Sequence, residues 1–280
     1  MLEIIKFDSF KKGKNLLVLG AVHGNEICGY KAISKIVNKI KNGKITVKSG
    51  SITFIPICNP EANIQNKRFI DINLNRVFKK ITKPAKYEEI ISQKIIKYID
   101  KCDYLLDIHS IPTDGPSFAF LDKDNTEVKE FVEMQNFKHI IKGWNELYDG
   151  EDNSTCGYGF RKGKICVTIE CGNRNDPNGI NLAETAIQNS LAYLKIADCQ
   201  SNINESQSKY IEMEKVVYKT KNGNLSKCWN HLDKVEKGEI IAKYDDGEEI
   251  KADRDYLMIM PHNDDNVKIG NEWFYLGKFL

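Results

Sequence analysis

The sequence predicts an α/β fold, in which helices flank a mixed, largely parallel sheet, followed by a small C-terminal β domain. Over the first two-thirds of the chain, short apolar runs alternate with segments whose apolar residues recur every three or four positions. This alternation of strands and helices is typical of parallel sheets in α/β proteins. After about residue 203 the chain becomes more polar, and short apolar pieces alternate with turn signals such as Asp245-Asp246-Gly247. That pattern is typical of a small β unit.

The expected strands are short apolar runs, several of them followed by glycine, proline or asparagine. They cover Asn15–Gly20, Ser51–Ile57, Tyr104–Ile108 and Ile165–Ile169. The expected helices carry apolar residues on one face, so that each can pack against a sheet. They cover Glu26–Lys41, Tyr87–Tyr98 and Leu182–Ile196.

One domain boundary is expected, in the polar segment 198–209, which has the composition of a linker. Residues 1–200 are expected to form the main domain. Residues 208–280 are expected to form the small β domain, which covers or flanks the functional edge of the sheet.

Charge and cysteine content exclude several classes of function. Lys and Arg number 41 and Asp and Glu 39, a net charge of +2 that argues against nucleic-acid binding. The chain has no apolar run of about 18 residues, and its N-terminus lacks a signal-peptide pattern, so neither a membrane span nor secretion is expected. Its eight cysteines form no C-x-x-C pair and are interpreted as reduced thiols of a cytoplasmic protein. A thiol nucleophile stays a minor alternative, and a homo-oligomer stays open.

Titratable residues follow three of the expected strands. The first strand leads into His23 and Glu26, another into His109, and a later one into Glu170. In open α/β sheets, ligands bind outside the carboxyl ends of the strands. Because those ends meet at one edge, we expect the four side chains to converge on one site.

Three of these residues have the chemistry of a catalytic zinc site. His23 and Glu26 stand three positions apart, which brings their side chains together at a tight turn, and His109 supplies a third ligand. Two histidines and a glutamate with an open fourth position describe a catalytic zinc centre with one Zn²⁺ per chain. Each residue alone is more often structural, but three at equivalent strand ends favour the site. The remaining histidines, His139, His231 and His262, are expected to be structural or exposed.

Two further carboxylates have expected roles at this edge. Glu170 is expected to act as the general base and acid, which takes a proton from water and passes it to the leaving nitrogen. Asp107 stands two residues before His109. It either orients that histidine or simply pairs at a strand end, and the sequence favours neither reading.

A long polar segment, Asn59–Phe78, follows the second strand and carries Arg68 and Arg76. Long loops at this position often carry function. The two arginines are suited to binding a substrate carboxylate and stabilising a developing oxyanion. The alternative is that Arg76 forms a structural salt bridge.

Together these segments resemble the succinylglutamate desuccinylase/aspartoacylase family, a branch of the zinc carboxypeptidase-like hydrolases. The resemblance covers roughly residues 15–195 and is looser in the tail, at Met260-Pro261 and Glu272–Gly277. The matching segments, in order, are Gly20–Glu26, Asn59-Pro60 with Ala62, Arg68–Asp71, Leu74–Arg76, Asp107–His109 and Ile169-Glu170.

The resemblance implies a carboxypeptidase-like fold and hydrolysis of the amide bond of an N-acyl amino acid or a similar small carboxylated amide. It implies zinc ligation by His23, Glu26 and His109, with Glu170 as general base and acid. By the same matching, Arg68 polarises the substrate carbonyl and belongs to the catalytic set, and Asn75 and Arg76 bind the substrate's carboxylate.

The sequence departs from the family pattern at three places. Asn73 stands where some relatives carry an acidic residue, Arg161 lies close to a further family arginine but not clearly in register with it, and the family's substrate-capping tyrosine is left unassigned in the tail. These departures leave the acyl group and the amine open. A zinc carboxypeptidase acting on a peptide or cell-wall fragment is the alternative enzyme, and a non-catalytic binding protein is the alternative class.

Overall fold

The computed structural model describes residues 1–148, 152–199, 208–263 and 267–280. Most of the predicted linker, segment 198–209, lies outside the described residues. Among the helices described, none combines the length and apolar composition that crossing a membrane needs.

Strands of the described residues form one sheet of eleven strands and a second of three. The large sheet has, in spatial order, β1 (Ile5–Asp8), β3 (Ser51–Ile55), β2 (Asn15–Leu19), β4 (Tyr104–Ile111), β7 (Ile165–Asn173), β5 (Phe118–Leu121), β6 (His139–Lys142), β8 (Lys209–Tyr218), β14 (Glu272–Phe279), β13 (Tyr256–Ile259) and β10 (Lys234–Val235). The small sheet has β12 (Glu249–Lys251), β11 (Ile240–Tyr244) and β9 (Gly223–Leu225).

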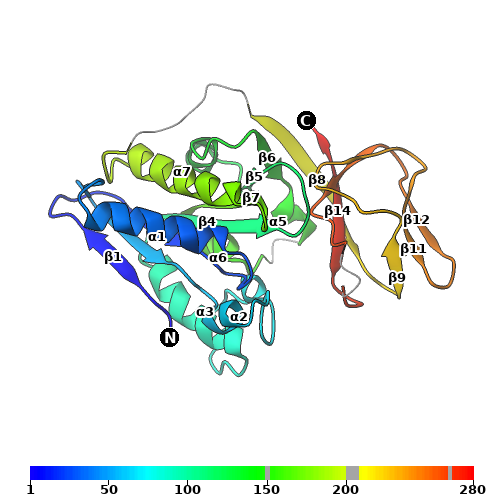
Figure 1. Cartoon of the computed structure of the whole chain (residues 1–280), viewed down its shortest axis with the longest axis horizontal. Helices are drawn as coiled ribbons and strands as arrows, with labels where there is room; N and C mark the ends of the chain where they lie inside the picture. Colours follow the sequence, from blue (N-terminus) through cyan, green and yellow to red (C-terminus); the bar gives the residue numbers. More distant parts are fainter. Residues whose placement is uncertain (149–151, 200–207, 264–266) are drawn as a thin grey trace.

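Helices cover both faces of the large sheet (Figure 1). They are α1 (Cys28–Lys41), α2 (Pro60–Ile64), α3 (Tyr87–Ile99), α4 (Thr126–Glu133), α5 (Trp144–Leu147), α6 (Thr155–Arg161) and α7 (Asn178–Tyr193), with a 3-10 turn, η1, at Leu74–Arg76. Helices α1, α4 and α7 pack on one face through residues such as Ile33, Phe131 and Ile187. Helices α3 and α6 pack on the other face, through Ile95 and Cys156 among others.

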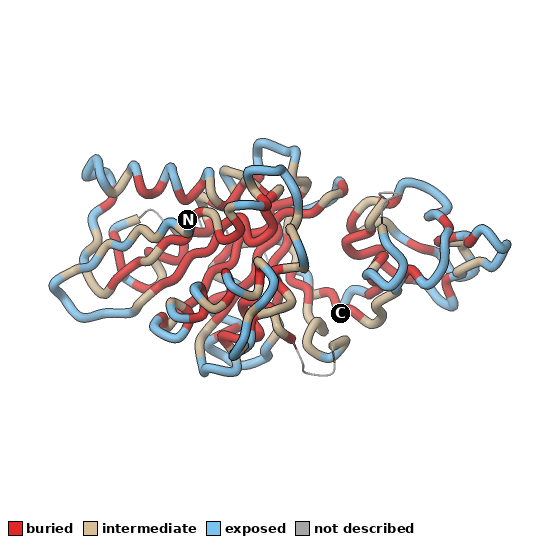
Figure 2. Tube along the Cα trace, turned by 90° about the horizontal axis from the view of Figure 1, so that it is seen from below, coloured by how far each residue is buried: buried red, intermediate tan, exposed pale blue. Residues whose placement is uncertain are grey.

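The centre of the sheet is parallel, as predicted: β3, β2, β4 and β7 run in one direction, and β5, β6 and β8 also pair in parallel. The β5–β7 pair and the outer pairs are antiparallel. These central strands are buried on both faces, which explains their continuous apolar runs. Figure 2 shows the buried chain concentrated along this sheet, with the helices exposing their outer sides.

The strands after residue 208 continue the large sheet, because β8 pairs with β6 on one side and β14 on the other. Only β9, β11 and β12 form the small C-terminal sheet, at the far end of the molecule in Figure 1. The division of the chain into two domains stays a prediction.

Two strands are longer than the sequence predicts, which corrects the position of His109 and Glu170. Both residues lie within strands, β4 and β7, rather than after them. The physical reason is that β4 and β7 keep pairing with each other beyond the end of β2, whose last residue, Leu19, pairs with Asp107. His109 therefore still projects past the end of a neighbouring strand, where the loop after β2 crosses over.

Candidate metal centre and cavity

Neighbouring positions on β4 and β7 place four polar side chains on one face of the sheet. Asp107 and His109 alternate with apolar residues on β4, and they pair with Thr168 and Glu170 on β7. Side chains two positions apart on a strand share a face. Because Leu105 faces the α3–α6 side, these four polar residues also lie on that side of the sheet.

The loop after β2 brings His23 and Glu26 to the same place. The backbone N–H of Glu26 donates to the carbonyl of His23, which closes a tight turn, and Gly24 N donates to the carbonyl of Arg68. A Cβ at Gly24 would lie 2.3 Å from the backbone of Ala62. Only glycine therefore lets this turn pack directly against α2.

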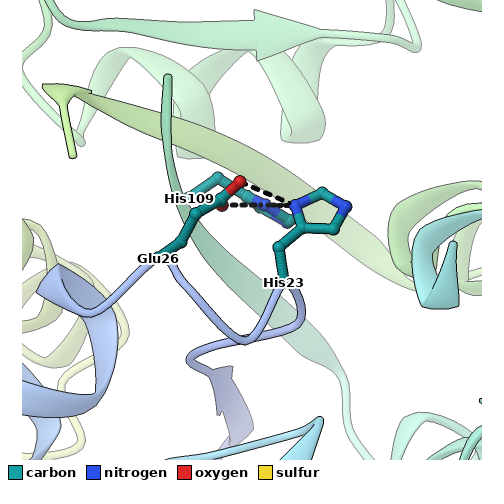
Figure 3. A group of neighbouring side chains, drawn as sticks. All are labelled: His23, Glu26 and His109. Carbon is teal, nitrogen blue, oxygen red and sulfur yellow. Dashed lines mark hydrogen bonds and ion pairs between the residues drawn. The ribbon is translucent and has the colours of Figure 1, made fainter. Parts of the chain in front are cut away.

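The predicted ligands His23, Glu26 and His109 converge on one point (Figure 3). Glu26 Oε1 lies 2.9 Å from Nδ1 of His23, and Oε2 lies 2.9 Å from Nδ1 of His109. The two Nδ1 atoms are 3.2 Å apart. Ligands about 2.0–2.1 Å from a tetrahedral zinc are spaced by roughly 3.3 Å. The donor set and spacing therefore fit a metal ion held by Nδ1 of both histidines and the carboxylate of Glu26.

The far side of each imidazole contacts an oxygen. Nε2 of His23 is 3.0 Å from Oδ1 of Asn73. Nε2 of His109 is 3.0 Å from Oδ2 of Asp107, and that same oxygen accepts from the hydroxyl of Thr155. Outer contacts of this kind fix the tautomer and orientation of metal-binding histidines. The geometry thus favours the orienting reading of Asp107 and gives Asn73 the same place behind His23.

The three ligands are buried, with His23, Glu26 and His109 being 3%, 1% and 2% exposed. Burial opposes the charged form of His109, but the carboxylates of Asp107 and Glu26 outweigh it and raise the pKa of His109 well above its ordinary value. Burial, aided by the charge of Arg68, lowers the pKa of His23 to about 4. Burial opposes the charged form of Glu26 too, but the two histidines hold its pKa well below the ordinary value. His23 is thus kept neutral and Glu26 ionised, as metal ligation requires.

Glu170 lies beside the ligands but makes few contacts. It is 9% exposed, and its Oε2 has no hydrogen-bond partner among the described residues. Burial raises the pKa of Glu170 to about 8. A carboxyl group with a pKa near neutrality can both accept and release a proton under physiological conditions.

A buried carboxylate that the sequence does not single out shapes the arginine-bearing loop. Glu88, on α3, accepts hydrogen bonds from the backbone N–H groups of Ile70, Asp71 and Ile72. It also accepts from the side chain of Asn59. Four donors on one fully buried carboxylate fix the path of the chain between Arg68 and η1.

This loop places Arg68, Asn75 and Arg76 at the cavity. Arg68 Nη1 donates to Glu26 Oε1 at 2.7 Å. The side chain of Asn75 accepts from the backbone N–H of Thr155 at 3.0 Å. The structure thus brings all three residues next to the metal centre, and their roles toward a substrate stay predictions.

Arg76 is paired within the protein. Its Nη2 and Nε lie 2.9 and 3.3 Å from Oε1 of Glu272, on β14. Its guanidinium also stacks near the rings of Trp144 and Tyr148, at 5.1 and 5.5 Å from their centroids. The salt bridge weighed as the alternative for Arg76 is therefore present, at the wall of the cavity.

One cavity of about 60 Å³ joins these groups. Its lining includes the tail residues Met260, His262, Glu272 and Tyr275. His262 was expected to be structural or exposed, and its place in the lining was not foreseen. Tyr275 is a tail tyrosine at the site, whereas Arg161 donates to the backbone carbonyls of Phe78 and Asp152 and is not among the lining residues.

Comparison with known proteins places the sequence in a family of hydrolases. The pattern of the succinylglutamate desuccinylase/aspartoacylase catalytic domain matches residues 12–195. The chain is 29% identical over 154 residues to the succinylglutamate desuccinylase of Vibrio vulnificus, covering 50% of this chain and 44% of that protein. It is 24% identical over 237 residues to a probable aspartoacylase of Acaryochloris marina, covering 76% of each. The match thus spans less than half the length of the Vibrio relative.

Solved structures agree on the fold. A succinylglutamate desuccinylase/aspartoacylase from Rhodobacter sphaeroides superposes with a TM-score of 0.80 at 15% identity, covering 100% of this chain and 90% of the other. The product-bound ectoine utilization protein EutE (DoeB) from Ruegeria pomeroyi gives 0.80 at 19% identity, covering 98% and 88%. With the catalytic-domain pattern matched from residue 12 to residue 195, the chain belongs to the succinylglutamate desuccinylase/aspartoacylase family of hydrolases.

Proposed function

We propose that the protein is a zinc-dependent deacylase that hydrolyses the amide bond of an N-acyl amino acid or a similar small carboxylated amide. The observation that carries the proposal is the convergence of His23, Glu26 and His109 beside the buried carboxyl group of Glu170. When bound, zinc supplies Lewis-acid chemistry and lowers the pKa of water toward about 7.

The protein's own groups have separate tasks in this reaction. Glu170 takes a proton from the attacking water and passes it to the nitrogen that leaves, so that the amine departs neutral. Arg68 directs its guanidinium at the carbonyl oxygen of the substrate and stabilises the negative charge that develops there. Asn75 and Arg76 are proposed to donate to the substrate's carboxylate.

The lining of the cavity favours this reading over the alternative carboxypeptidase. The tail residues Met260, Glu272 and Tyr275 wall it on one side, which suits a small substrate. A peptide or cell-wall fragment needs an open groove that continues past the metal centre. The eight free cysteines support the cytoplasmic location that we propose for the enzyme.

The proposal is tested by metal analysis and a hydrolysis screen. Zinc-loaded protein is expected to hold one zinc per chain and to release product from an N-acetyl, N-formyl or N-succinyl amino acid. A Glu170→Gln variant is expected to keep its zinc and lose roughly 10²–10⁴-fold in turnover. The matched control is Glu3→Gln, which changes an exposed glutamate and should leave turnover unaltered. Full turnover in the Glu170 variant would exclude it as the base, and failure to bind zinc would exclude the metal centre.

A further inference from the structure

Part of the cavity, here called the distal end, is formed by Asp122, Trp144, Tyr148, Glu272 and Tyr275, for which no hydrogen bond or ion pair to the three metal ligands is found in the described residues. All but Tyr148 line the cavity directly, and Tyr148 contacts Glu272 and Tyr275. These residues come from three segments of the chain, and none was singled out for a substrate role by the sequence.

Glu272 already forms an ion pair with the guanidinium of Arg76. Oε1 of Glu272 accepts hydrogen bonds from Nε and Nη2 of Arg76. It also accepts from the hydroxyl of Tyr148, at 2.6 Å. A third nitrogen, Nη1, donates to the backbone carbonyl of Asn75. The positive charge of Arg76 is thus neutralised by a carboxylate of the protein itself. Oε2 of Glu272 is the oxygen left to accept from a ligand.

Asp122 adds a second carboxyl group to this lining, and no positively charged side chain of the described residues is paired with it. It follows β5 directly, and within the described residues no ion pair to it is found. Its buried Oδ1 has no hydrogen-bond partner there either. Burial, together with the charges of Asp152 and Glu146, raises the pKa of Asp122 well above its ordinary value. A buried acceptor without a donor costs free energy unless a ligand supplies that donor.

These observations leave the distal end without a free positive charge: Arg76 and Glu272 neutralise each other, and no cation of the described residues lies beside Asp122 to favour its ionised form. We propose that the substrate carries an ammonium group at this end, held by Asp122 and Glu272, and not a second carboxylate. The inference rests on the proposed function and narrows its substrate to an N-acyl diamino acid. The substrate's single carboxylate is then left to Asn75 and to the remaining N–H groups of Arg76.

Three ligands of similar length test the proposal: Nα-acetyl-L-ornithine with an ammonium end, Nα-acetyl-L-norvaline with a methyl end, and Nα-acetyl-L-glutamate with a carboxylate end. Dissociation constants are measured by calorimetry on zinc-loaded protein with the Glu170→Gln change, and kcat/KM on zinc-loaded protein without it. The ornithine derivative is expected to bind about tenfold more tightly than the norvaline derivative, since one charge-assisted contact has that effect. The glutamate derivative is expected to bind most weakly.

Two variants each replace one of these carboxyl groups by an amide. Asp122→Asn and Glu272→Gln are each expected to erase most of the preference for the ornithine derivative, and Glu272→Gln to improve binding of the glutamate derivative about tenfold. The control, Glu214→Gln on β8, breaks a surface pair with Arg254 and should preserve the ranking. Because Asp122→Asn breaks no ion pair in the described residues, it tests the idea even if Glu272→Gln disturbs folding.

The outcomes separate this inference from the proposed function. Tight binding of the ornithine derivative without its hydrolysis would support an ammonium site at the distal end and would contradict the proposed deacylase activity. Preference for the glutamate derivative, no binding of any of the three, or an unchanged ranking in both variants would overturn the inference.

Discussion

The charged groups are neutralised in different ways at the metal end and at the distal end of the cavity. At the metal end, Glu26 faces two imidazoles that are buried and point their Nδ1 atoms at its oxygens, an arrangement that a cation completes. At the distal end, Arg76 and Glu272 already neutralise each other. In the proposed function, the groups that bind the metal ion set the reaction type, and the Arg76–Glu272 pair contributes to the choice of substrate.

Both ends depend on the loop from Arg68 to Arg76, which reaches from the metal centre to the distal end. Glu88 holds this loop through three backbone N–H groups. The largest effect is therefore expected from Glu88→Gln, which weakens the acceptor and leaves buried donors poorly paired. We expect the free energy of unfolding, measured by denaturant titration, to fall by roughly 3 kcal/mol. Metal binding and substrate binding should both weaken, because the change affects both ends.

The neighbouring residue provides a matched control for Glu88. Glu89 also accepts from two backbone N–H groups, those of Ala85 and Lys86, but it is only partly buried. Glu89→Gln should have a much smaller effect on unfolding than Glu88→Gln. Equal effects of the two changes would mean that helix capping, and not the buried network, stabilises the loop.

A change behind His109 should affect the metal end alone. Asp107→Asn keeps the size of the side chain but removes the charge that faces Nε2 of His109. Metal affinity, measured by competition with a chelator, is expected to fall about 10–100-fold, while the ranking of ligands at the distal end stays the same. Asp103→Asn, at the other end of the same strand, where Asp103 accepts from Asn15, is the control. A normal metal affinity in the Asp107 variant would mean that Asp107 does not orient His109 for metal binding and that its role is structural.

The difference between the two ends also explains what the sequence could predict. His23 and Glu26 stand three residues apart, and His109 and Glu170 belong to neighbouring strands, so a local pattern and the geometry of parallel strands bring them together. The family and the fold followed from the same segments. The position of His109 and Glu170 inside β4 and β7 was missed, because strand ends depend on the pairing of neighbours and not on composition.

The distal end was missed because its contacts are long-range. Glu272 and Arg76 are 196 residues apart in the chain, and no local pattern links them. Glu88 was missed since its partners are backbone groups, which carry no sequence signal. Asp122 is different: it directly follows the apolar run Phe118–Leu121, so the strand-end rule that found the ligands would have marked it had β5 been recognised.

The two ends also differ in the sign of their response to pH, and this is the smallest effect expected. Glu170 and Glu272 line one cavity, but burial raises the pKa of Glu170 from 4.5 to about 8. Burial acts on Glu272 in the same direction, yet Arg76 and Tyr148 outweigh it and hold the pKa of Glu272 below its ordinary value. In metal-free protein, Glu170 binds a proton in the folded state that the unfolded chain has released, so its contribution to stability is lost as pH rises from about 4.5 to 8. Glu272 contributes above its ordinary pKa, and that contribution is lost as pH falls through the lowered value.

Unfolding of metal-free protein, followed between about pH 2 and pH 8, separates the two carboxylates. Relative to the unchanged protein, Glu170→Gln is expected to gain stability as pH rises, by at most about 1.4 kcal/mol for each pH unit. Glu272→Gln is expected to be the less stable protein near neutral pH and to approach the unchanged one toward the acid end. Parallel curves for both variants would mean that the two carboxylates share one environment. The contrast between the metal end, where the charge of Glu26 faces two histidines, and the distal end, where Arg76 and Glu272 form an ion pair, would then be wrong.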